Sequence, residues 1–128
     1  MLRVASDLTA AVLEQALTGE ATRQRVTADN LANVDTPGYR PRQVMFEDEL
    51  RAALRDPDEG VTTARIAAVQ PRSVTAGGLP LRRDGNAVDV EREVVRLAES
   101  ELHYSALIKL LARKFSLLKS VATEGNKT

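Results

Sequence analysis

The last third of the chain repeats an apolar residue at alternating steps of four and three, and this pattern restricts the possible folds most. The heptad seam, as we call these positions, comprises Val90, Val94, Leu97, Glu101, Tyr104, Ile108, Leu111, Phe115 and Leu118, and Ala122 continues it. All of these residues except Glu101 are apolar or aromatic. This spacing is typical of a helix that packs along another helix in a coiled coil.

Further apolar residues lie beside the seam and make it wider than a two-stranded coiled coil needs. They are Leu102, Leu107, Leu110, Leu117 and Val121. We expect the helix over 86–124 to begin at a cap formed by Asn86 or Asp89 and to end at Gly125. Such a helix is about 50 Å long at 1.5 Å per residue, so it needs more than one neighbour to cover it.

The first 36 residues predict a second long helix. Leu8, Ala11 and Val12 share one helical face, and no proline precedes Pro37. Gly19 is the weak point, because glycine costs about 1 kcal/mol relative to alanine inside a helix. The second half of this segment is polar, so we expect it to be helical only when it packs against a partner.

A proline–glycine pair ends this helix. Thr36 is held in an extended conformation because it precedes a proline. Pro37 then presets the first corner of a turn, and Gly38 supplies the positive φ that the second corner of a type II turn requires. The candidate helix-terminating turn therefore comprises Asn33, Thr36, Pro37, Gly38 and Tyr39. The alternative is an ordinary helix end without a special role.

The middle of the chain is irregular, since 37–85 contains all five prolines and five of the seven glycines. An amphipathic pattern predicts a short helix near 46–55, and we interpret Val61 to Leu81 as extended, with or without a short hairpin. The predicted fold is mainly α: two long terminal helices form a coiled-coil hairpin around an irregular segment with a short helix and small β-strands. The predicted divisions are 1–36, 37–85 and 86–124.

Composition excludes several classes of function. The 18 basic residues balance the 18 acidic ones, so we expect no nucleic-acid partner, which would require a basic surface. The absence of cysteine excludes disulfides, thiolate zinc sites and cysteine nucleophiles. We expect no membrane-spanning segment, because no apolar run approaches about 20 residues. Asp7 and Glu14 interrupt the N-terminal apolar stretch, which therefore does not resemble a cleavable secretory signal.

The titratable residues do not predict a catalytic or metal site. His103 and Glu99 lie one helical turn apart, but two ligands are too few for structural zinc. Glu47 to Glu49 are consecutive carboxylates without a nucleophile or oxyanion motif nearby, so we interpret them as a solvated face. We expect no cofactor, no small-molecule substrate and no enzymatic activity.

Two residues leave alternatives open. Glu101, the one charge in the seam, either points to solvent or fixes the helix register by meeting an arginine. Arg23 and Arg25 are the candidate partners if the N-terminal helix packs antiparallel. Tyr39 either packs within its own turn or acts as a wedge between subunits.

Both ends of the chain resemble a known family. The stretch "ADNLANVDTPGYR" is similar to the signature of the flagellar axial proteins, which form the rod, hook and hook-associated group. The stretch "DGNAVDVEREVVRLAESELHYSALIKLLARKFSLLKSV" resembles the C-terminal region of the short rod members. The resemblance covers Leu8–Arg42 and Asp84–Val121 and is weak across Asp56–Leu81. One departure is the pair Val34 and Asp35, where relatives often have Ala-Asp or Ala-Asn.

This resemblance implies a structural subunit of the proximal rod of the bacterial flagellar basal body. Its terminal helices would assemble to transmit torque and line the export channel. The implied partners are other copies of the chain, other rod proteins, and components of the basal body base and export apparatus. The resemblance also implies export by the flagellar type III apparatus. The alternative is a helical type III export substrate or adaptor that binds a partner without building a rod.

Overall fold

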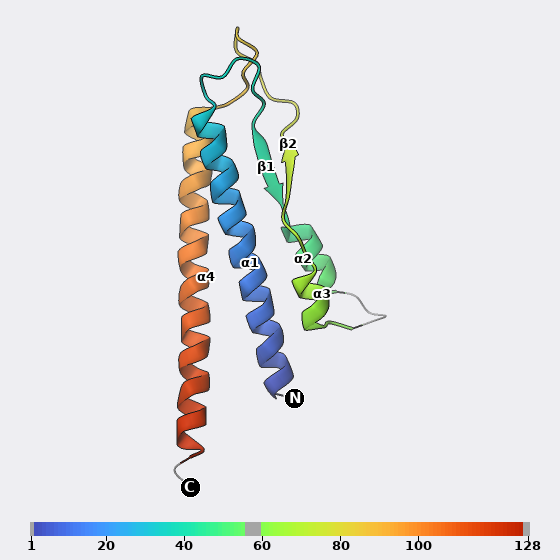
Figure 1. Ribbon diagram of the computed structural model, residues 1–128, viewed down its shortest axis with the longest axis vertical. Coiled ribbons are helices and arrows are strands. Elements are labelled where there is room, and N and C mark those ends of the chain that lie inside the picture. The colour runs from blue at the N-terminus through green and yellow to red at the C-terminus, as the bar shows by residue number, and fades with distance from the viewer. Residues whose placement is uncertain (1, 56–59, 127–128) are drawn as a thin grey trace.

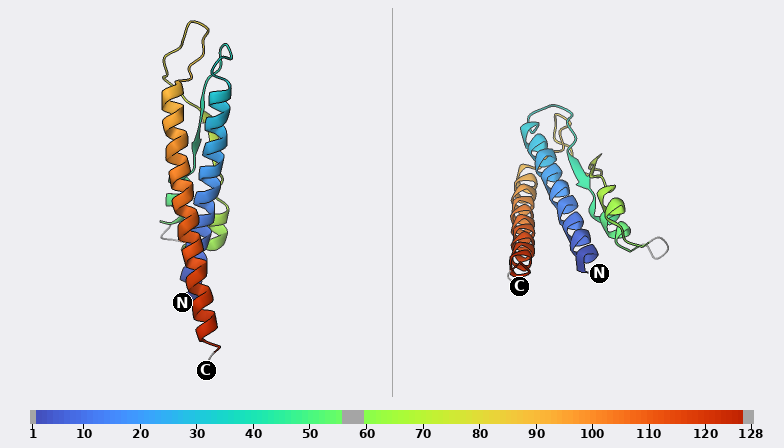
Figure 2. Two further views of the ribbon diagram at one scale, coloured as in Figure 1. Left: turned by 90° about the vertical axis from the view of Figure 1, so that its left-hand side faces the viewer. Right: turned by 60° about the horizontal axis from the view of Figure 1, so that its bottom comes forward.

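Two long antiparallel helices dominate the computed structural model, which describes residues 2–55 and 60–126. Helix α1 (Leu2–Ala32) and helix α4 (Val90–Glu124) lie side by side, with both described ends of the chain at one end of the molecule (Figure 1). The middle of the chain forms β1 (Arg42–Met45), α2 (Glu47–Ala53), α3 (Thr63–Ala67) and β2 (Arg72–Thr75). These elements pack on the side of α1 away from α4 (Figure 2). The predicted mainly α fold is confirmed.

The ends of the long helices follow from local chemistry. Asp89 caps α4, because its carboxylate accepts a hydrogen bond from the backbone N–H of Arg92 at 3.2 Å. Glu91 and Glu93 lie in the first turn, where the positive end of the helix dipole stabilises negatively charged side chains. At the other boundary α1 ends at Ala32, directly before the predicted turn.

The small sheet is not a hairpin within Val61 to Leu81, a segment that we interpreted as extended with or without one. Only β2 lies in that segment, and it pairs antiparallel with β1, which precedes α2. The register places Arg42 opposite Thr75 and Val44 opposite Ser73. The two paired strands are therefore separated in the sequence by α2 and α3. Alternation of apolar and polar residues within one segment could not indicate such a distant pairing.

Helix α3 is a second correction, because it lies in a segment that we expected to be extended. The Thr62 side chain caps it by accepting a hydrogen bond from the backbone N–H of Arg65. Ile66 on this helix is completely buried. One cap and one buried side chain form too short a pattern to be recognised as a helix in the sequence.

The main apolar core joins the middle segment to α1. Its buried residues are Leu50, Ala53, Ile66 and Val69. The N-terminal helix face that the sequence predicts, with Leu8, Ala11 and Val12, packs against this cluster. This apolar face of α1 therefore contacts α2 and α3 and leaves other residues to contact α4.

Gly19 provides space for an aromatic ring. A Cβ atom at this position would overlap the end of the Phe46 ring, which is buried beside Val26 and Val44. The guanidinium of Arg23 lies 5.0 Å from the centre of the same ring. The glycine that weakens an isolated α1 thus allows β1 and α2 to pack closely against it.

Candidate functional site

A buried asparagine joins three elements at the looped end of the hairpin. Asn30 is fully buried, and its amide nitrogen donates to the Arg42 carbonyl at 2.8 Å and to the Glu93 carboxylate at 2.9 Å. Its amide oxygen accepts from the Arg42 backbone N–H at 2.9 Å and from the Tyr39 hydroxyl at 3.0 Å. Asn30 therefore connects α1 to β1, to the turn and to α4 with its full hydrogen-bonding capacity.

Tyr39 belongs to this junction and is half-buried. Burial raises the pKa of its hydroxyl, and the nearby carboxylates of Asp29 and Glu93 act in the same direction against Arg42. A raised pKa keeps the hydroxyl protonated, so it remains a donor to Asn30. The structure thus gives Tyr39 a packing role within its own chain.

The predicted turn has the geometry that its sequence requires. Gly38 has a φ of 73°, and the Tyr39 N–H donates to the Thr36 carbonyl at 3.2 Å. The Thr36 hydroxyl also donates to the Asn33 side chain at 3.0 Å. Pro37 and Gly38 are exposed at its corner.

The turn is bonded to the loop that leads into α4. The Gly38 N–H donates to the Asp84 carbonyl at 2.8 Å, and the Ala87 N–H donates to the Tyr39 carbonyl at 3.1 Å. These bonds join residues that are far apart in the sequence. The proline–glycine turn therefore fixes where the chain enters α4 as well as where it leaves α1.

Asn86 completes this connection and is the clearest residue that sequence reasoning missed. It is fully buried, and its amide nitrogen donates to the carbonyls of Asn33 at 2.9 Å and Thr36 at 2.7 Å. Its amide oxygen accepts from the Val88 N–H at 2.7 Å. The sequence suggested Asn86 only as a possible helix cap. We name Asn30, Asn86, Tyr39 and Glu93, together with their partners above, the polar junction.

Buried polar groups also set the register halfway along the hairpin. The Ser100 hydroxyl donates to the Glu20 carboxylate at 2.7 Å, and His103 Nδ1 lies 3.5 Å from the same side chain. The Arg23 guanidinium contacts Glu20 at 2.7 Å. Together with the Asn30–Glu93 bond, these contacts align α1 and α4 antiparallel.

Glu101 does not set the register within the chain. It is exposed, and Arg23, the first candidate partner, is bonded to Glu20 and Glu47 instead. Arg25 is exposed, and the described residues contain no ion pair between it and Glu101. The solvent-facing alternative therefore describes Glu101 in this chain.

Only one side of the heptad seam faces α1. Leu97, Tyr104 and Leu111 are half-buried in the hairpin, next to the buried Glu93 and Ser100. The other side comprises Val94, Ile108 and Phe115, which are between 44% and 53% exposed. Val90 and Leu118 continue the inner side at its two ends and are 43% and 46% exposed. The seven-residue repeat places apolar residues in two neighbouring rows along α4. The buried hydrogen bonds to α1 fix the rotation of α4 about its axis, so that one row faces α1 and the other is exposed.

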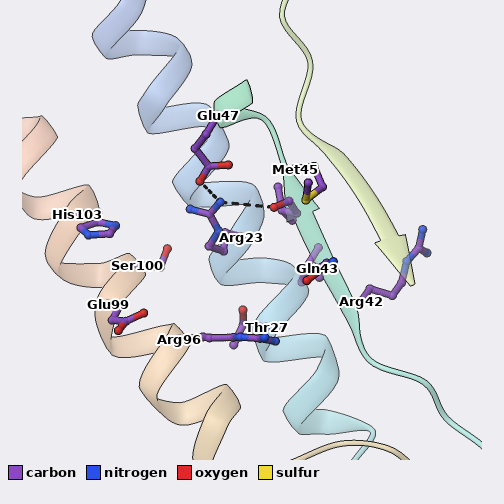
Figure 3. A pocket seen from close by; sticks show the side chains of 12 residues that line it. Arg23, Thr27, Arg42, Gln43, Met45, Glu47, Arg96, Glu99, Ser100 and His103 are labelled. Carbon is purple, nitrogen blue, oxygen red and sulfur yellow. Dashed lines mark hydrogen bonds and ion pairs between the residues drawn. The ribbon is translucent and has the colours of Figure 1, made fainter. Parts of the chain in front are cut away.

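A hollow of about 340 Å³ opens between α1, β1 and α4 (Figure 3). Arg23 reaches from α1 toward Glu47 and the β1 backbone, while Glu99 and His103 line the α4 side. The arginines, Glu47 and His103 of this hollow are engaged in ion pairs and backbone bonds. Across residues 2–55 and 60–126, no cluster of three or more histidine or carboxylate side chains could hold a metal ion.

The consecutive carboxylates of α2 form ion pairs that the sequence did not indicate. Asp48 pairs with Arg51 at 2.9 Å, and Glu49 pairs with Arg72 of β2. For Glu47, burial alone would raise the pKa, but hydrogen bonds and charge from Arg23, with the backbone N–H groups at the start of α2, lower it overall. These residues connect α2 to its neighbours.

Among the residues that the structure describes, no helix combines the length and the apolar composition that crossing a bilayer requires.

Two long helices that are joined at one end by buried hydrogen bonds and uncovered along one apolar stripe are typical of a subunit of a larger assembly, because exposed apolar patches mark protein interfaces. Residues 11–40 match the family described as "Flagella basal body rod protein". The flagellar basal body rod protein FlgB of Bacillus subtilis is 31% identical over 123 residues, which cover 88% of this chain and 92% of the relative. FlgB of Salmonella typhimurium is 32% identical over 126 residues, covering 88% and 91%. FlgB of Escherichia coli is 29% identical with the same coverage.

The chain belongs to the FlgB family of flagellar basal body rod proteins. It is a structural subunit of the rod in the flagellar basal body and not an enzyme.

Proposed function

We propose that this chain builds the proximal rod by packing its terminal helices against those of neighbouring subunits. The neighbours are other copies of the chain and other rod proteins. In the assembled rod these helices line the export channel and transmit torque. The observation that carries this proposal is the uncovered side of the heptad seam, where large apolar side chains point away from the hairpin. Burial of such a stripe stabilises an assembly by about 25 cal/mol per Å².

The polar junction supports the torque-bearing role. Its hydrogen bonds join α1, the turn and α4 through buried groups, so rotation of one helix against the other would leave donors and acceptors unpaired. A subunit that transmits torque needs such resistance between its helices. The apolar core around Ile66 adds the middle segment to the same unit.

Export by the flagellar type III apparatus is the second part of the proposal. The resemblance to the flagellar axial proteins supports it, and it adds components of the basal body base and export apparatus to the partners. The alternative is a helical type III export substrate or adaptor that binds one partner without building a rod. An adaptor would leave basal bodies free of the chain, whereas a rod subunit co-purifies with them.

A matched pair of substitutions tests the proposal on intact cells. Phe115 belongs to the uncovered side of the seam, and the adjacent Ser116 is exposed about 100° further around α4. Phe115→Asp should abolish swimming and remove the chain from purified basal bodies, because it places a carboxylate in a buried contact. Ser116→Asp should leave both unchanged.

Leu111→Asp completes this series. Leu111 is half-buried between the helices of the chain itself, so this substitution should reduce helix content as well as assembly. Circular dichroism of the purified variants separates the two effects. Normal incorporation of Phe115→Asp into basal bodies would show that the seam is not an assembly surface.

A further inference from the structure

The first half of α4 carries an exposed apolar patch among carboxylates. Its apolar side chains are Val94, Val95 and Leu102, which are 50%, 55% and 71% exposed. We name this apolar patch, together with the carboxylates of Glu91, Glu99 and Glu101, the acidic ridge. Residues 89–102 contain two arginines, of which Arg96 is paired to the buried Glu93. The ridge is therefore both apolar and negatively charged.

The second half of α4 forms a groove of opposite charge with the start of α1. The basic groove, with a volume of about 390 Å³, is lined by Leu13, Leu110, Leu117 and Val121 together with Arg113 and Lys114. Residues 105–121 contain four basic residues and no acidic residue. Among the residues that the structure describes, neither Arg113 nor Lys114 takes part in an ion pair. The groove is therefore apolar at its floor and positively charged at its rim.

The ridge and the groove match in chemistry but cannot meet within one chain. Both lie on α4, and their centres are separated by about 25 Å at 1.5 Å per residue. A straight helix cannot fold back over that distance. The partner that matches each surface in apolar character and in charge is the other surface on a second copy.

We propose that the acidic ridge of one copy occupies the basic groove of the next. This inference rests on the proposed rod function and names the surfaces by which copies meet. Because ridge and groove are different surfaces, each contact leaves one of each free, and the assembly continues head to tail. Neighbouring copies would be displaced by about 25 Å along α4. Burial of apolar side chains provides the attraction, and the opposite charges select the register.

Disulfide cross-linking tests this contact directly, since the chain has no cysteine of its own. Val95→Cys with Leu117→Cys places one thiol on each surface. Mild oxidation of the purified double variant should give a ladder of species beyond the dimer, whereas each single variant should remain uncross-linked. A product that stops at the dimer would indicate a closed antiparallel pair, and absence of any product would exclude the contact. Either result overturns the proposal.

Charge reversal provides an independent readout. Glu99→Lys with Glu101→Lys reverses the ridge, and Arg113→Glu with Lys114→Glu reverses the groove. In the double-cysteine background, either reversal should lower the cross-linked fraction at least about tenfold, equivalent to about 1.4 kcal/mol. Combining both reversals in one chain should restore it. Circular dichroism checks that each variant keeps its helix content.

The two proposals fail in different ways. If the combined reversal does not restore cross-linking, while Phe115→Asp still blocks incorporation into basal bodies, the ridge–groove contact is wrong and the rod function stands. If the ladder forms but the chain is absent from basal bodies, the contact stands and the proposed function is wrong.

Discussion

Two buried asparagines join the looped ends of both long helices to the proline–glycine turn. Asn30 and Asn86 are both fully buried, and each connects segments of chain that are distant in sequence. An aspartate could not donate, and a glutamine would be one methylene too long for the same positions. An unpaired buried donor or acceptor costs about 1–3 kcal/mol. The junction therefore depends on amide geometry.

Removing one of these amides should have a large effect. Asn30→Ala should lower the free energy of unfolding by about 2–4 kcal/mol, because it leaves the Arg42 backbone and the Glu93 carboxylate without this partner. Asn33→Ala is the control, since the half-buried Asn33 side chain bonds only to residues three and four positions away, and it should cost less than about 1 kcal/mol. Urea denaturation measures both. Equal losses would show that the junction is not specific to Asn30.

The turn glycine provides a test of backbone geometry alone. Gly38 has a φ of 73°, and a Cβ atom there would meet nothing within 4 Å. Gly38→Val should therefore destabilise the chain through strain, by about 1–3 kcal/mol. Gly38→Ala should cost less, and Pro37→Ala less again, because other residues adopt the φ of proline. Denaturant midpoints rank the three variants, and incorporation into basal bodies should follow the same order. A neutral Gly38→Val would contradict this account of the turn.

At the level of whole elements, periodicity was sufficient to predict both long helices. The 3.6-residue spacing from Leu8 and the heptads from Val90 identify them, and the Thr36–Tyr39 turn separates them from the middle segment. Periodicity could not indicate which side of α4 faces α1, because the apolar face of α4 is broader than the surface that one neighbouring helix covers. Buried hydrogen bonds from Glu20 and Asn30 decide it, and such pairings leave no local pattern.

The same limit applies to the small elements and to the polar junction. β1 and β2 pair across two intervening helices, and α3 consists of five residues. Of the polar junction, the turn residues could be predicted from the fixed φ of Pro37 and the freedom of Gly38. Asn86 could not, because its partners lie about 50 residues away.

Because the Phe46 ring packs against Gly19, we expect a substitution there to change stability in the direction opposite to that expected from helix propensity. Gly19→Ala should strengthen an isolated α1 by about 1 kcal/mol, yet destabilise the folded chain because the new methyl group displaces a buried ring. Phe46→Leu should tolerate Gly19→Ala better than the wild-type background does. A double-mutant cycle of unfolding free energies measures this coupling. Additive effects would show that the ring does not rest on Gly19.

The start of α2 should respond to pH through Glu47. The pKa of Glu47 is lowered in the folded chain, chiefly by Arg23. A lowered pKa contributes stability above the pKa of the unfolded chain, and this contribution is lost as the pH falls through the folded value. Glu47→Gln should therefore lower the thermal midpoint near neutral pH and leave it unchanged in acid. A loss of the same size at both pH values would exclude the ion pair as its cause.

Over the whole molecule, burial is unequal along the two long helices. The polar junction and the core around Ile66 bury the looped end and the middle, while the second half of α4 is largely exposed. We expect the second half of α4 to be poorly ordered in the isolated monomer, because covering its wide apolar face requires neighbours.

Hydrogen exchange should show this gradient directly. In dilute monomer the backbone amides after Leu107 should exchange fastest, and those near Asn30 and Glu93 slowest. The same measurement on assembled rods should slow the fast group. Uniform, concentration-independent protection along α4 in the monomer would show that the helix needs no neighbour.

Because the polar junction lies at one end of the hairpin, a small rotation at the junction moves the other end of α4 by a large distance. The buried asparagines lie at the pivot, and α4 extends about 50 Å from it at 1.5 Å per residue. One degree of rotation at the pivot therefore moves the far end of α4 by about 0.9 Å. A tilt of five degrees moves it by nearly the width of a side chain, which is enough to take a leucine out of its contact. In the proposed rod, the spacing of subunits at the open end therefore depends on a few amide groups at the opposite end of the molecule, together with the Ser100–Glu20 bond halfway along.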